Sequence, residues 1–218
     1  MQQRRTAAGV PGQTEFTLEY VPDPVYGPGV EWLIAGLEES IREGSRFPVG
    51  ETVGIGWLDC YVTDRGDGTL GLCEPDFAQV PPAFVAGTAL ALEQLWFQIE
   101  VAKSVGLDPE LDFPNHPQRA VTCDAFTAAG SVLMQRHPHG DSESGWFIGC
   151  PGDIHQHTGD VLRSAPLYEL AIVKPAIVGY LALPPGCSIV LADGAPEITR
   201  GNERLVPQPG SLLAEMFP

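Results

Sequence analysis

The sequence predicts an α+β protein built of two small mixed domains, each an antiparallel sheet with packed helices. Short segments of alternating character, typical of strands, occur in both halves of the chain. Two longer segments carry apolar residues at helical spacing, and they do not alternate regularly with the strands as βαβ units would. Because 218 residues suffice for two cores, we place the domains at residues 14–112 and 113–218.

The N-terminal half begins with a strand over 16–20, where apolar and polar residues alternate. Apolar residues three and four positions apart predict a helix over 30–43, which ends at Gly44. One long strand is expected over 52–63. It is followed by a Gly-rich turn at 65–68 and a return strand over 70–73.

A second helix is predicted over 82–105, with prolines in its first turn and Gly106 just beyond its end. Its broad apolar surface is typical of a central core helix. The polar residues 1–13 are expected to fray, and residues 107–117 form the connector between the domains.

The C-terminal half shows a succession of short strands separated by turns. An apolar stretch over 168–183 is interrupted by Pro175, which suits the first position of a short helix. Residues 153–165 are polar and are expected to form a loop. Strands are expected at 120–126, 132–135, 146–150, 188–192 and 197–200.

Charge is the strongest bulk feature, since 28 acidic and 12 basic residues give a net charge of −16. Such a field repels nucleic acid and anionic membrane and favours capture of a basic partner. Residues 1–112 hold 18 of the acidic and 6 of the basic residues, so this half should contribute most of a basic-partner surface. No apolar run is long enough to cross a bilayer and no secretory signal is evident, so we expect a cytoplasmic protein.

Cysteines and histidines are the candidate sources of chemistry in this sequence. The five cysteines form no CxxC pair, and Cys60 and Cys187 lie in apolar strand-like segments, which indicates reduced thiols used for packing. Four histidines form two His-x-His pairs, His137/His139 and His155/His157, but both pairs fall in expected loops.

We therefore expect exposed loop histidines, with no metal and no cofactor. The alternative is a small metal-dependent or thiol enzyme that uses the loops at 137–157, for example with Cys123 as nucleophile. No Gly-x-Ser-x-Gly elbow and no phosphate-binding loop occurs.

A family resemblance is carried by an acidic-Ser-Gly-Trp strand at 143–149 and the motifs that follow it. These are Tyr168-Glu169-Leu170, then Lys174-Pro175-Ala176-Ile177-Val178, then Leu181-Ala182-Leu183-Pro184-Pro185-Gly186. Over roughly residues 118–198 this succession resembles the C-terminal module of immunity family thirty-three of the bacterial polymorphic toxin systems. The resemblance implies a protein that is not an enzyme and that binds one toxin and blocks it.

The predicted function is therefore an immunity protein for interbacterial competition, including type VI secretion, that occludes a secreted toxin. The negative charge favours a basic toxin in a 1:1 complex, a nuclease above all, without direct contact with nucleic acid or membrane. A general adaptor with several modest partners is a further alternative. Trp57 and Trp146 are expected in the core, with partner contact as the second interpretation. The partner-binding candidates are Glu38, Glu39, Glu43, Asp59, Asp64, Asp67, Glu74, Asp76, Asp141, Glu143, Trp146 and Asp153.

Overall fold

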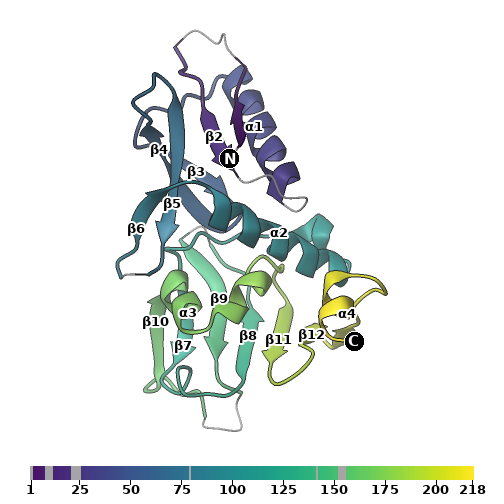
Figure 1. Cartoon of the computed structure of the whole chain (residues 1–218). Helices are drawn as coiled ribbons and strands as arrows, with labels where there is room; N and C mark the ends of the chain where they lie inside the picture. Colours follow the sequence, from purple (N-terminus) through teal and green to yellow (C-terminus); the bar gives the residue numbers. More distant parts are fainter. Residues whose placement is uncertain (1, 8–11, 21–25, 79, 141, 152–155) are drawn as a thin grey trace. The chain divides into compact units, whose positions relative to one another are not determined.

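The computed structural model of the chain describes residues 2–7, 12–20, 26–78, 80–140, 142–151 and 156–218. It confirms the α+β class, with helices packed on largely antiparallel sheets (Figure 1). The chain divides into two compact units, Met1–Trp96 and Phe97–Pro218, so the division falls inside helix α2 (Ala89–Ser104). The domain boundary predicted at 112/113 stays a prediction.

The N-terminal unit contains a two-stranded antiparallel ribbon and a four-stranded antiparallel sheet. The ribbon is formed by β1 (Gln2–Arg5) and β2 (Thr17–Tyr20). The sheet has the order β3 (Thr52–Ile55), β4 (Leu58–Asp64), β5 (Leu70–Asp76) and β6 (Ala83–Ala86). An isolated bridge between Phe16 and Leu70 joins the ribbon to the sheet.

Two predictions for this unit are wrong. Residues 2–5 do not fray, because they form β1, which pairs along its whole length with β2. Residues 1 and 8–11 of the segment predicted to fray lie outside the described residues. The segment 52–63 is a hairpin and not one strand, because Gly56 has a positive φ of 61° and turns the chain between β3 and β4. Trp57 therefore lies in a turn, although it is fully buried, as expected of a core tryptophan.

The predicted helix over 82–105 also starts later, at Ala89. Its first residues form β6 instead, where Phe84 and Val85 pair with β5. Gly87, with a φ of 136°, separates this strand from the helix. The carboxylate of Glu74 then accepts a hydrogen bond of 2.8 Å from the backbone N–H of Ala91 and so caps the first turn.

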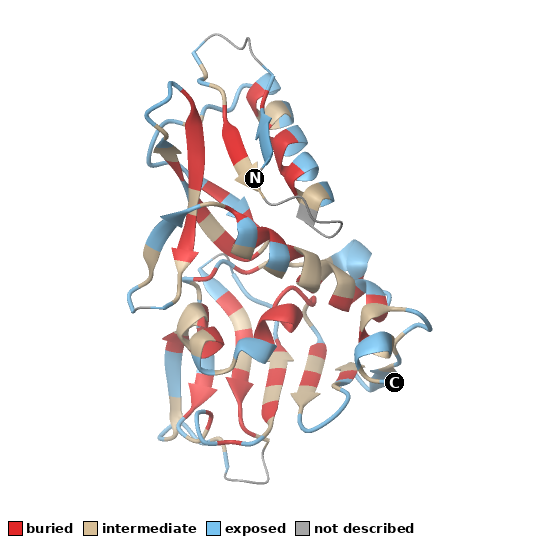
Figure 2. Cartoon of the chain, in the orientation of Figure 1, coloured by how far each residue is buried: buried red, intermediate tan, exposed pale blue. Residues whose placement is uncertain are grey.

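Helix α1 (Tyr26–Arg42) supplies an apolar stripe to the core of the N-terminal unit. The predicted stripe is confirmed, since each of its members is buried (Figure 2). Burial of each such side chain stabilises the fold by roughly 1.5–3 kcal/mol. The stripe consists of Val30, Leu33, Ile34, Leu37 and Ile41.

The C-terminal unit is built on one seven-stranded sheet. Its strands are β7 (Arg119–Cys123), β8 (Val132–Arg136), β9 (Glu143–Gly149), β10 (Leu162–Pro166), β11 (Cys187–Leu191), β12 (Glu197–Arg200) and β13 (Glu203–Leu205). Their order is β10-β7-β9-β8-β11-β12-β13. Neighbouring strands run antiparallel except β7 and β9, which are parallel. Strand β10 corrects the predicted loop over 153–165, because its residues 162–166 pair with β7.

Short helices accompany this sheet. They are α3 (Leu167–Val173), α4 (Leu212–Met216) and the 3-10 helices η1 (Asp108–Glu110) and η2 (Pro175–Tyr180). Pro175 stands in the first turn of η2, as predicted. Among the described residues, no helix combines the length and the hydropathy that crossing a bilayer requires.

Strand β9 has two different faces. Ser144, Trp146 and Ile148 are buried, whereas Glu143 and Phe147 on the opposite face keep contact with solvent, and the same alternation is visible along β8 (Figure 2). The indole N–H of Trp146 donates a hydrogen bond of 3.0 Å to the carbonyl of Leu181, just after η2. One face of the sheet therefore packs under the α3–η2 segment, and the other face keeps contact with solvent among the described residues of this unit.

Candidate partner-binding surfaces

Helix α1 carries the acidic face predicted from the sequence. Glu39 and Glu43 are exposed, and among the described residues neither pairs with a cation. Glu38 is half-buried and accepts a hydrogen bond of 2.7 Å from the backbone N–H of Ala7. Glu39 and Glu43 are thus the carboxylates of this helix that are available to a partner.

Glu74 lies in the core and not on the surface, with 6% of its area exposed. Burial raises the pKa of its carboxyl, and the hydrogen bonds from the first N–H groups of α2 oppose that rise. Its role as helix cap removes it from the predicted partner surface.

The β4–β5 hairpin uses its acidic residues locally. Asp64 accepts a hydrogen bond of 2.8 Å from the N–H of Gly66, and Asp67 accepts bonds from the hydroxyl and the N–H of Thr69 at 2.6 and 3.0 Å. These bonds, the hydroxyl bond first, lower the pKa of Asp67. Both carboxylates are exposed, but they also hold the turn that the Gly-rich segment predicts.

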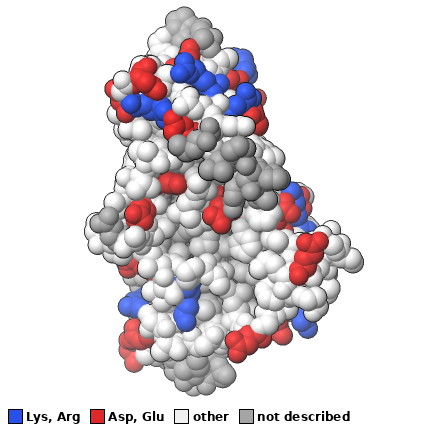
Figure 3. Space-filling view, in the orientation of Figure 1, with Lys and Arg blue, Asp and Glu red and all other residues white. Residues whose placement is uncertain are grey.

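The remaining acidic candidates of this unit are half-buried. Burial raises the pKa of Asp59, and Asp76 accepts a hydrogen bond of 2.9 Å from the N–H of Ala78. Figure 3 shows acidic and basic side chains of the N-terminal unit next to one another on the visible face. Arg65 of this unit forms ion pairs with Glu19 at 2.7 Å and with Asp67 at 3.3 Å.

The open face of the C-terminal sheet forms a groove of about 640 Å³. Strand β7 contributes Val121, which is 42% exposed, and β9 contributes Phe147 and the exposed Glu143. Leu162 of β10 adds a further apolar side chain. Sequence reasoning named Glu143 but missed the apolar members. The alternation of side chains between the two faces of each strand could have indicated these apolar residues. It could not show which face of the sheet is exposed to solvent.

The Ser-Gly-Trp motif builds the strand that lines this groove. The hydroxyl of Ser144 donates a hydrogen bond of 2.8 Å to the carbonyl of Arg119 and thereby joins β9 to β7. Gly145 has a φ of 70°, and a Cβ there would lie 2.4 Å from the carbonyl oxygen of His137. Trp146 is only 1% exposed, so it supports the groove from the core side and does not belong to the partner surface.

Beneath the motif lies a buried cation. Arg136 donates a hydrogen bond of 3.0 Å to the carboxylate of Asp112, which His139 also contacts at 3.0 Å. Burial lowers the pKa of Arg136, and the Asp112 carboxylate opposes that change. Burial alone would raise the pKa of Asp112, but the hydrogen bonds from His139 and Arg136 outweigh it, so the net shift is downward.

The three loop histidines that the structure describes, His137, His139 and His157, do not gather into one metal-binding group. His137 is exposed, His139 contacts Asp112, and Nε2 of His157 lies 3.5 Å from the thiol of Cys150. His155, Asp141 and Asp153 lie outside the described residues.

An open sheet face with apolar side chains and a carboxylate at its rim is what a protein-binding domain presents. Residues 97–200 match the family model of the Imm33-like domain. The C-terminal part of the chain is therefore an Imm33-like domain, which confirms the assignment to this family of immunity proteins. Comparison with curated proteins and with solved structures gave no match.

Proposed function

We propose that the protein binds a cognate secreted toxin and neutralises it by covering its active site. The observation that carries this proposal is the Imm33-like domain, whose motif strand β9 lines an open groove. An immunity protein acts through binding and needs no catalytic group of its own. The motif residues Ser144 and Trp146 are buried and form hydrogen bonds within the sheet and to the segment after η2, which supports a structural role for the motif.

The groove supplies the apolar part of the proposed interface. Val121, Phe147 and Leu162 lie together on its surface, and aromatic and aliphatic side chains in such positions anchor protein interfaces. Glu143 stands at the rim, where a carboxylate gives orientation and specificity more than affinity. This groove is the part of the Imm33-like domain that we assign to the toxin.

The net charge of −16 supports a basic toxin. Toxins that act on nucleic acid need a cationic cleft, so a nuclease is the class that this charge suits best. Glu39 and Glu43 of α1 would accelerate the encounter by electrostatic steering. We propose a 1:1 complex that forms in the cytoplasm, where a nuclease would meet its substrate.

Co-expression tests the proposal. The toxin domain encoded beside the gene is expressed in a bacterial host with the full chain, and growth is measured. We expect the wild-type chain to rescue growth and Val121→Asp to rescue poorly, since it places a charge in the groove. Val173→Asp is the matched control, because Val173 on α3 is 44% exposed but does not line the groove.

Equal rescue by the two variants would exclude the groove as the interface. Absence of rescue by the wild-type chain, with both proteins present in soluble form, would exclude the proposed function itself.

A further inference from the structure

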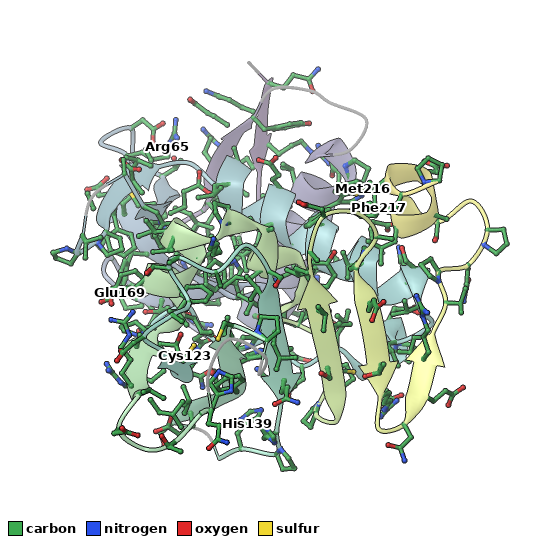
Figure 4. All side chains as sticks on the ribbon, turned by 90° about the horizontal axis from the view of Figure 1, so that it is seen from below. Arg65, Cys123, His139, Glu169, Met216 and Phe217 are labelled. Carbon is green, nitrogen blue, oxygen red and sulfur yellow. The ribbon has the colours of Figure 1, made fainter. Side chains whose placement is uncertain are left out.

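Two cysteines that are distant in the sequence meet inside the C-terminal sheet. Cys123 is the last residue of β7 and is labelled in Figure 4, and Cys150 directly follows β9. Because these strands are parallel, with Val121 beside Phe147, their ends lie side by side. The two sulfur atoms are 3.6 Å apart, and both residues are fully buried.

His157 completes a group of three potential metal ligands. Its Nε2 lies 3.5 Å from the sulfur of Cys150, and the three ligand atoms all lie within 4.8 Å of one another. No other group of this kind is formed by the His, Cys, Asp and Glu residues that the structure describes. We propose that Cys123, Cys150 and His157 bind a zinc ion.

Two of the three distances between ligand atoms fit tetrahedral zinc, and the third, from Cys123 to His157, is at most 4.8 Å. Zn–S bonds of about 2.3 Å and Zn–N bonds of about 2.0–2.1 Å, at tetrahedral angles, require about 3.8 Å between two sulfurs and about 3.6 Å between sulfur and nitrogen. The corresponding distances here are 3.6 and 3.5 Å. A disulfide would require about 2.05 Å between the sulfurs, so the two cysteines are thiols, and their separation leaves them able to bind one ion.

The surroundings also suit a metal thiolate. The backbone N–H of Cys150 donates a hydrogen bond of 3.3 Å to the sulfur of Cys123, and such bonds stabilise negative charge on a ligand sulfur. Gly149 leaves room for that sulfur, since a Cβ at this position would lie 3.1 Å from it. The ring of Phe147 packs edge-on against His157 at 5.0 Å and orients the imidazole.

Full burial of both cysteines favours metal binding over the thiol-enzyme alternative, because a catalytic thiolate must be reached by its substrate. Three protein ligands leave a fourth position for a water molecule. A bound zinc ion would tie the segment around His157 to the sheet, next to the groove that this histidine helps to line. The zinc proposal does not rest on the proposed toxin binding, so either proposal can fail alone.

The test uses the full chain, freed of metal by a chelator under reducing conditions and titrated with Zn²⁺ and separately with Co²⁺. We expect one equivalent of each ion to bind, a sulfur-to-cobalt charge-transfer band in the Co²⁺ spectrum, and a higher melting temperature with Zn²⁺. His157→Gln removes a direct ligand and should weaken Zn²⁺ binding by more than the ~10–100-fold that loss of an outer-shell partner costs. His137→Gln, a change in an exposed loop histidine, should bind as the wild type does.

Three results would overturn the proposal. The first is no binding of Zn²⁺ at micromolar concentration by the folded, reduced wild-type chain. The second is equal Zn²⁺ affinity in His157→Gln and the wild type, and the third is a Cys123–Cys150 disulfide found by mass spectrometry in protein purified under reducing conditions. The first and third readouts use the wild-type chain, so they decide the question even where a variant does not fold.

Discussion

The guanidinium carbon of Arg136 lies 5.2 Å from the centre of the Trp146 ring. Arg136 is 2% exposed and Trp146 is 1% exposed, so the motif tryptophan packs against a buried cation. Two nitrogens of this guanidinium, Nε and Nη1, have no hydrogen-bond partner among the described residues. The Trp146 ring and the carboxylate of Asp112, together with contacts of Nη2 to the Asp112 carbonyl and to His139, offset the cost of burying this charge.

Replacement of Arg136 by Ala should lower the free energy of unfolding by about 2–4 kcal/mol, because it empties a buried site and removes the partner of Asp112. Urea denaturation measures the change. Arg163→Ala is the control, since Arg163 is half-exposed and contacts Asp124 only at 4.0 Å. Its effect should stay within about 0.5 kcal/mol. Equal effects of the two changes would contradict the structural role of Arg136.

Gly145→Ala tests why the motif contains glycine. Alanine would have to adopt the positive φ of Gly145, and its methyl group would collide with the carbonyl oxygen of His137. We therefore expect the free energy of unfolding to fall by at least ~2 kcal/mol. Gly140→Ala is the matched control, because a Cβ at Gly140 meets no atom within 4 Å. A stability of Gly145→Ala equal to that of the control would show that β9 does not adopt this conformation.

His116 should make the fold sensitive to mild acid. Burial lowers its pKa from 6.5 to about 4, so the unfolded chain takes up a proton at this residue before the folded chain does. The contribution of His116 to the free energy of unfolding is fully present above pH 6.5 and is lost as the pH falls toward 4. Between pH 7 and pH 5 the loss is about 2 kcal/mol.

Chemical denaturation of the wild type and of His116→Gln at both pH values measures this loss. The variant should lose less stability on acidification than the wild type, whereas His137→Gln, altered at an exposed histidine, should follow the wild type. Identical pH dependence in all three proteins would exclude His116 as the cause.

The acidic face of α1 should affect how fast the toxin binds. Reversal of both charges in Glu39→Lys/Glu43→Lys should slow association about tenfold at low salt and change dissociation little, because rim charges act mainly on the encounter. Stopped-flow fluorescence measures both rates. Glu197→Lys/Glu203→Lys makes the same change in net charge at two exposed residues of the C-terminal unit. An equal slowing by both pairs would assign the effect to total charge and not to α1.

Local patterns in the sequence predicted much of the fold. The stripe of α1, the β4–β5 turn and five of the seven strands of the C-terminal sheet are confirmed, because residue spacing and turn residues determine them directly. Strand β10 was expected as a loop, and β13 was not predicted. Strand β1 was missed, since its four polar residues owe their conformation to pairing with β2. The start of α2 was missed for a similar reason, because its cap, Glu74, lies on another strand.

The candidate site could be predicted only in part. The sequence indicated which residues are acidic, but not that Glu74 is buried or that Asp64 and Asp67 hold a turn. Those roles depend on tertiary neighbours. The meeting of Cys123 and Cys150 likewise follows from the parallel pairing of β7 and β9, a long-range feature that no spacing of cysteines reveals.

Isothermal titration of the purified chain with the purified toxin domain encoded beside its gene tests the central proposal most directly. We expect one toxin bound per chain with a nanomolar dissociation constant, together with loss of the toxin's activity at equal concentration. No heat of binding at micromolar concentrations, with the toxin fully active in the presence of excess chain, would contradict the account.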